Sequence, residues 1–80
     1  MTVQEALKQS NLTGTGTRDS LTLDLQDGQR ATLTREDVAA WPDHERSRVS
    51  FIVVAGVLYE LRFSLDFMQR ARRYFDLVRG

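Results

Sequence analysis

The residues with the clearest chemical potential are three consecutive polar side chains, Asp43-His44-Glu45, because a histidine flanked by carboxylates is typical of catalytic and metal sites. His44 is the only histidine in the chain, and the triplet directly follows Pro42. Neighbouring residues of an extended loop point in different directions, whereas such sites need side chains that converge from a rigid element. We therefore predict a surface loop here, without a metal ion or a catalytic role.

Other residues that could support catalysis also lack the partners that the chemistry requires. The segment Gly14-Thr15-Gly16 has two glycines of a dinucleotide-binding loop but neither the third glycine nor a preceding strand. No histidine or lysine base is placed beside a serine or threonine hydroxyl by the sequence. The chain contains no cysteine, which excludes a thiol nucleophile and a disulfide framework and is typical of the cytoplasm. We predict a non-enzymatic protein that holds no cofactor.

Charge is balanced overall but unevenly distributed along the chain. The 11 basic and 11 acidic side chains cancel, so bulk basicity cannot drive nucleic-acid binding. Residues 19–45 hold seven acids and two bases, whereas residues 62–80 hold five arginines and two aspartates. We expect a dipolar surface on which these acids contact a partner: Asp24, Asp27, Asp37, Asp43 and Glu45.

The basic counterpart of this surface is an arginine cluster near the C-terminus, Arg70, Arg72 and Arg73. Arginine is suited to bidentate recognition of carboxylate or phosphate. Asp66 precedes Arg70 by four residues, and Arg72 precedes Asp76 by four, so ion pairs along a helix would neutralise part of the cluster. We therefore favour a protein partner over direct nucleic-acid binding for these arginines.

The elements that must position these residues are indicated by capping signals, alternation and glycines. Thr2 and Glu5 have the spacing of a capping box, and the glycine- and threonine-rich segment 13–17 predicts a flexible linker. The expected order is a short helix to about residue 10, a hairpin of strands 20–25 and 29–34, a short helix from Thr34 through Ala40, a hairpin of strands 49–54 and 57–63, and a helix of about 14 residues from Ser64.

Glycine turns set the predicted register of both hairpins. A three-residue loop ending at Gly28 or at Gly56 places that glycine in the left-handed position of a bulged type I turn and sends the apolar residues of both strands to one face. The pairs predicted for the first hairpin are Leu21 with Leu33, Leu23 with Ala31 and Leu25 with Gln29. The pairs predicted for the second are Val49 with Leu61, Phe51 with Tyr59 and Val53 with Val57.

This register leaves three aliphatic side chains, Ile52, Val54 and Leu58, together on the outward face of the second hairpin, beside Glu60 and Arg62. Clustered exposed aliphatic residues are typical of partner-binding surfaces. Two alternatives remain: the N-terminal helix crosses to this face and buries them, or a second copy of the chain does.

Together the elements predict an α+β fold, a four-stranded antiparallel sheet from two hairpins packed on one face by an N-terminal and a longer C-terminal helix, with a short helix between the hairpins. We expect the 80 residues to form a single compact domain with a flexible linker near 13–17. The longest apolar run, from Phe51 to Tyr59, is interrupted by Gly56 and is too short to span a membrane. We expect a cytoplasmic protein.

The whole layout resembles the small phage-encoded anti-CRISPR proteins. The shared features are the length, a compact hairpin core such as Leu21 to Leu33 and Val49 to Phe63, the arginine-rich segment 69–74, acids concentrated in one stretch, and no catalytic set. The resemblance implies steric or electrostatic blocking of a CRISPR surveillance complex or nuclease in the host cytoplasm, often at its DNA-binding surface. The strong acidity of the DNA-mimicking members is absent, which argues against mimicry by the whole molecule.

Following that resemblance, we predict a protein-interaction module that inhibits a CRISPR–Cas complex by blocking target DNA recognition, as a monomer or homodimer. Its candidate anchors are Arg72, Arg73, Trp41 and Tyr74, with Trp41 expected to pack in the core or at its rim. The alternative is a nucleic-acid-binding or regulatory module that uses the arginine-rich C-terminal helix. A structural homodimer subunit is the third hypothesis.

Overall fold

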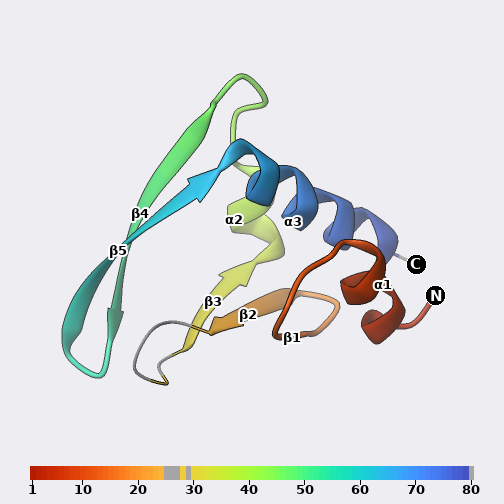
Figure 1. Cartoon of the computed structure of the whole chain (residues 1–80), viewed down its shortest axis with the longest axis horizontal. Coiled ribbons are helices and arrows are strands. Elements are labelled where there is room, and N and C mark those ends of the chain that lie inside the picture. Colours follow the sequence, from red (N-terminus) through yellow and green to blue (C-terminus); the bar gives the residue numbers. More distant parts are fainter. Residues whose placement is uncertain (25–27, 29, 80) are drawn as a thin grey trace.

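The computed structural model describes residues 1–24, 28 and 30–79, and these have an α+β fold. Their strands form two antiparallel sheets, one of three strands and one of two (Figure 1). In this part of the chain the elements are α1 (Val3–Gln9), β1 (Thr15–Gly16), β2 (Ser20–Asp24), β3 (Arg30–Thr34), α2 (Arg35–Ala39), β4 (Ser47–Val54), β5 (Val57–Ser64) and α3 (Leu65–Leu77). The predicted α+β class and the order of helices and hairpins are confirmed, whereas the arrangement of the sheets differs.

Each helix begins at the hydroxyl residue that the sequence predicts. In α1 the Glu5 amide donates to Thr2 Oγ1 at 3.2 Å, and the Thr2 amide donates to the Glu5 carboxylate at 3.4 Å. A second capping box joins Thr34 and Asp37 at the start of α2. The Ser64 hydroxyl caps α3 by accepting a backbone N–H three residues on, at 3.2 Å. These bonds satisfy donors that a helix start leaves unpaired.

The segment 13–17, predicted to be a flexible linker, contains the two residues of β1. Gly16 pairs with Leu21 and Thr15 with Thr22, so β1 forms the edge of the three-stranded sheet. The Tyr74 hydroxyl, on α3, donates to the Thr17 carbonyl oxygen at 2.5 Å. This contact comes from a residue 57 positions away, which explains why the local composition did not reveal the strand.

The first hairpin has the predicted register wherever it is described. Leu21 pairs with Leu33 and Leu23 with Ala31. Gly28 has a φ of 75°, the left-handed conformation expected of it. The predicted pair of Leu25 and Gln29 and the rest of the loop lie outside the described residues.

The register predicted for the second hairpin is wrong by one residue. Val54 pairs with Val57 and Phe51 with Glu60, so the loop has two residues, Ala55 and Gly56. Both have positive φ, 51° and 80°, as in a type I′ turn. This turn matches the right-handed twist of the strands, which offsets the cost of a left-handed alanine.

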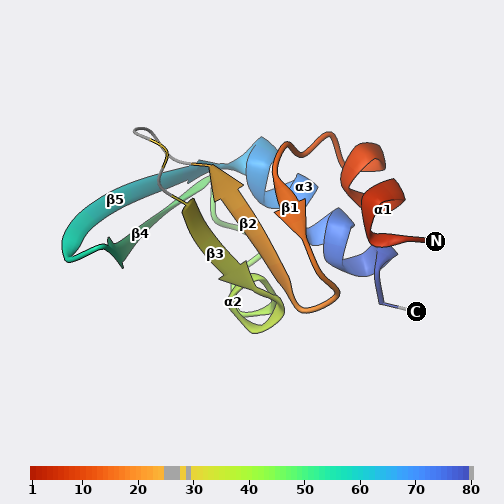
Figure 2. The same cartoon turned by 90° about the horizontal axis from the view of Figure 1, so that it is seen from below.

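The two hairpins do not join into the predicted four-stranded sheet. The chain turns through α2 and a loop after β3, and β4 and β5 pair only with each other among the described strands. Figures 1 and 2 show this second hairpin projecting from the body with its turn far from α3. Its other end is fixed by Phe63, whose ring centroid lies 5.6 Å from that of Trp41 and 5.0 Å from that of Phe67.

Helix α3 forms the centre of the hydrophobic core. It buries Met68, Ala71, Tyr74 and Phe75, and it packs against α1, α2 and the end of β5 (Figure 1). The core contains Ala6, Leu7, Leu21, Leu33, Val38, Trp41, Phe63, Met68, Ala71, Tyr74, Phe75 and Val78. With 13 residues α3 is well below the roughly 20 needed to cross a bilayer, and no other helix of the described chain could do so.

Burial of the Tyr74 hydroxyl is expected to make the free energy of unfolding decrease at alkaline pH. Burial raises the Tyr74 pKa above the ordinary 10.0, and the positive charge of Arg35 partly opposes the rise. Above about pH 10 the unfolded chain loses this proton first, so we expect the free energy of unfolding to fall, by at most about 1.4 kcal/mol per pH unit. Urea titrations at about pH 9 and about pH 11 should show a larger fall for the wild type than for Tyr74→Phe. Equal falls would contradict this role of Tyr74.

Candidate interaction surface

The most exposed apolar surface lies on the β4–β5 hairpin, residues 47–64, which we call the arm. Because paired residues of an antiparallel ladder share a face, the register divides the arm into two sides. The outer face carries Val49, Phe51, Val53 and Leu58. Phe51 and Leu58 are each 64% exposed and Val53 is 68% exposed. Contiguous apolar exposure of this kind marks binding sites on soluble proteins.

The inner face of the arm is turned toward α2. Ile52 and Val54 lie on it with their partners Tyr59 and Val57, and Ile52, Val54 and Tyr59 are half-buried. The sequence predicted that Leu58 would share a surface with Ile52 and Val54, but the structure places Leu58 on the opposite side. The cause is the two-residue turn, because a shift of one residue moves side chains to the other face of a strand.

A cleft of about 330 Å³ separates the arm from α2 and β3. Its α2 side carries Glu36 and Asp37, with Trp41 at the border. Its arm side is formed by β4 and includes part of Phe51, although that residue remains 64% exposed: Arg48, Ser50, Phe51 and Ile52. The Asp37 carboxylate already accepts the Thr34 amide hydrogen at 3.1 Å. The cleft is therefore lined by side chains of both charges.

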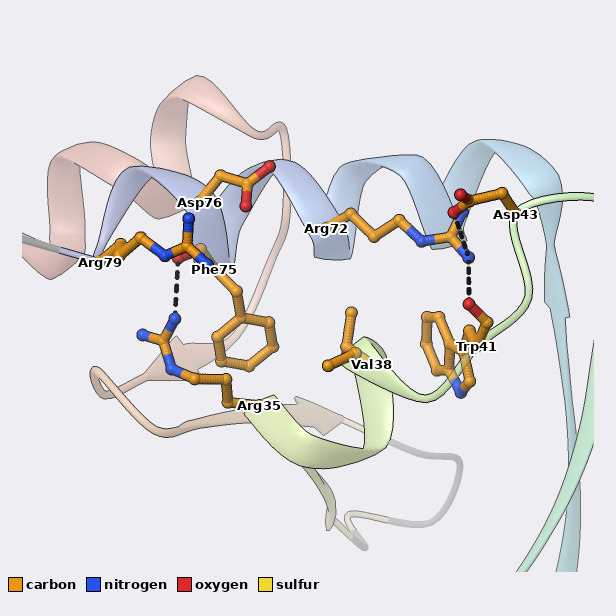
Figure 3. A pocket seen from close by; sticks show the side chains of 9 residues that line it. Arg35, Val38, Trp41, Asp43, Arg72, Phe75, Asp76 and Arg79 are labelled. Carbon is orange, nitrogen blue, oxygen red and sulfur yellow. Dashed lines mark hydrogen bonds and ion pairs between the residues drawn. The ribbon is translucent and has the colours of Figure 1, made fainter.

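A second pocket, of about 280 Å³, lies between α2 and α3 (Figure 3). Arg35 donates to the Phe75 carbonyl oxygen at 3.2 Å, and its guanidinium carbon lies 5.3 Å from the centroid of the Phe75 ring. Arg72 donates to the carbonyl oxygens of Trp41 and Pro42, both at 3.1 Å. The Arg35 guanidinium therefore joins α2 to α3, and the Arg72 guanidinium joins α3 to the loop after α2. Both groups bind carbonyl oxygens of the protein itself.

The predicted arginine cluster is divided by these contacts. Arg70 forms an ion pair with Asp66 and donates to the Asn11 carbonyl oxygen at 3.1 Å. Arg72 donates its hydrogen bonds to the loop after α2 and lies 3.8 Å from the Asp43 carboxylate. Arg73 is exposed, and no hydrogen bond or ion pair joins it to another described residue. Of the three predicted residues, Arg73 is the one whose charge is available to a partner.

The predicted acids also have separate roles. Asp24 lies 3.3 Å from Arg30, and Glu45 lies 3.2 Å from Arg48. Asp37 caps α2 as described above, and the Asp43 side chain is exposed beside Arg72. Asp27 lies outside the described residues. Each described acid contacts a different group of the chain itself.

Two of the predicted anchors are core residues. Tyr74 and Trp41 are buried, so neither ring is accessible to a partner.

Three exposed residues of the arm were not predicted from the sequence to lie on a binding surface. They are Val49, Phe51 and Val53, which were expected to point inward. The available signal was the dipeptide Ala55-Gly56, which also fits a two-residue turn once alanine is allowed a left-handed conformation.

Metal binding has no visible support in the described part of the chain. Within residues 1–24, 28 and 30–79, no three histidine, aspartate or glutamate side chains are grouped closely enough to hold an ion. His44 is exposed in the loop before β4.

No protein-family model matches the chain, and no curated protein or solved structure matches it either. The surface of the protein itself is therefore the basis for a functional proposal.

Proposed function

We propose that this protein is a non-enzymatic interaction module that binds a protein partner through the outer face of the arm. The observation that carries the proposal is the exposure of Phe51, Val53 and Leu58, all about two-thirds open on one side of a projecting hairpin. Burying such side chains against a partner is favourable by roughly 1.5–3 kcal/mol each. The flanking Glu60 and Arg62 would form a polar rim around this apolar centre.

The state of the arginines favours a protein partner over a nucleic acid. A surface that binds phosphates needs several free cations on one side, and Arg70 and Arg72 are engaged within the fold. The arm offers aliphatic and aromatic side chains, and phosphate groups do not bind to those. The chain's zero net charge points the same way.

The test compares a substitution on the arm with one on the arginine-rich helix. A tagged full-length chain should capture a stoichiometric protein from the lysate of its own host, and Leu58→Arg should weaken that binding about thirtyfold by placing a charge at the centre of the contact. Arg73→Glu, also exposed but on α3, is the matched control and should bind as the wild type does. Loss with Arg73→Glu alone, or recovery of nucleic acid in place of protein, would overturn the proposal.

A narrower form of the proposal follows the resemblance to anti-CRISPR proteins. In it the partner is a CRISPR–Cas surveillance complex or nuclease, and the bound arm blocks target DNA recognition. The same two variants test it with a purified complex and labelled target DNA. Wild type and Arg73→Glu should prevent DNA binding, and Leu58→Arg should not.

A further inference from the structure

The free edge of strand β5 is a feature of the arm that the cleft does not involve. Among the described strands β5 pairs only with β4. Because the two-residue turn closes on the hydrogen-bonded pair Val54 and Val57, such pairs alternate along the arm, and Leu58, Glu60 and Arg62 direct their N–H and C=O groups away from β4. Within the described chain, no backbone group outside this ladder bonds to those three residues. Neither the cleft nor the pocket between α2 and α3 is lined by a described residue of β5.

Two opposite charges lie on this strand without a partner in their own chain. Glu60 and Arg62 are both exposed on the outer face, across the hairpin from the apolar residues Phe51 and Val49. No ion pair or side-chain hydrogen bond joins either of them to another described residue. Charged side chains on an edge strand normally keep other strands away. Since this edge carries one charge of each sign, it repels a neighbouring strand in some registers and attracts it in others.

A second copy of β5 satisfies both charges in one register. In an antiparallel pair related by a two-fold axis at Leu61, Glu60 of each copy lies opposite Arg62 of the other. Both residues direct their backbone groups toward the new strand, as a hydrogen-bonded pair requires. Moving the axis to Glu60 or to Arg62 would instead place like charges opposite each other. The other pairs in this register are Tyr59 with Phe63 and Leu58 with Ser64, so the pairing ends before α3 begins.

We propose that β5 pairs antiparallel with β5 of a second copy about the axis at Leu61, giving a four-stranded sheet in the order β4-β5-β5-β4 across the two protomers. The inference goes beyond the proposed function, because it assigns the edge of the arm to a second copy and leaves the outer face to the other protein. The outer faces of the two arms then lie side by side on one sheet. Since strand pairing alone buries less than the roughly 800 Å² per partner of a standard interface, we expect a dissociation constant on the order of 10 μM.

The test reverses the two charges singly and together. Glu60→Arg sets two arginines opposite each other at both charged pairs, and Arg62→Glu sets two glutamates there, so each variant should raise the dimer dissociation constant at least about tenfold. Glu60→Arg/Arg62→Glu brings opposite charges together again, and its constant should return to within about threefold of the wild type. Arg73→Glu, on α3, is the matched control because it changes the net charge as Arg62→Glu does, and it should also stay within about threefold.

Light scattering across a concentration series, with circular dichroism to confirm folding, gives the readout. A wild type that stays monomeric to about 500 μM, well above the expected constant, would overturn the inference. Single reversals that leave the dimer intact, or a double reversal as weak as the single ones, would also overturn it, because either result shows that positions 60 and 62 are not opposed. Equal weakening by Arg73→Glu would contradict it too, since the cause would then be net charge.

A further variant separates the dimer from the proposed function. Val53→Arg changes the outer face on β4, away from the β5 edge. It should lose the protein partner and still dimerise, whereas Glu60→Arg should lose the dimer. Failure of the dimer and failure of the proposed function are therefore distinguishable.

Discussion

Replacing Gly16 with alanine is expected to lower the free energy of unfolding by about 3 kcal/mol. A Cβ atom at this position would overlap the Tyr74 hydroxyl oxygen and lie 2.9 Å from its Cζ. Tyr74 is fully buried, so its ring cannot swing away. The strain must therefore displace β1 or break the hydrogen bond from Tyr74 to the Thr17 carbonyl.

Urea unfolding of the single variants and of the double variant measures this effect. In a Tyr74→Phe background, Gly16→Ala should cost about 1 kcal/mol less, because the hydroxyl that it meets is gone. The ring carbon remains close, so the recovery should be partial. If the cost of Gly16→Ala is the same in both backgrounds, the overlap with the hydroxyl is not its cause.

The same truncation made at two leucines is expected to differ by about 3 kcal/mol between the sites. Leu21 is fully buried in the core, so Leu21→Ala removes packed methyl groups and leaves a cavity, at a cost of about 3 kcal/mol. Leu58 is exposed on the arm, so Leu58→Ala should change stability by less than about 0.5 kcal/mol.

Chemical denaturation of the two variants under identical conditions provides the comparison. Because the substitution is the same, differences in helix or strand propensity largely cancel and burial decides the result. A loss at Leu58 equal to that at Leu21 would mean that the outer face is buried against the protein's own core. That outcome would also remove the surface on which the proposed function depends.

The features predicted correctly are those fixed by interactions within a few residues. Thr2, Thr34 and Ser64 cap their helices because a hydroxyl and an amide three residues on can meet without help from the rest of the fold. The ion pair between Asp66 and Arg70 is likewise set by the helix repeat. Arg72 was expected to pair with Asp76 on the same grounds, but the loop after α2 brings two carbonyl oxygens within its reach.

Local patterns in the sequence were enough to predict the α+β class, the helix starts and the register of the first hairpin, because alternation, caps and glycine turns act within a few residues. The remaining features depend on how distant parts of the chain meet and on the conformation of the second turn. The distant Tyr74 hydroxyl holds Thr17 beside β1, and the left-handed Ala55 turns Phe51 toward solvent. The interaction surface belongs to this second group because a turn shortened by one residue exchanges the faces of a strand without changing its composition.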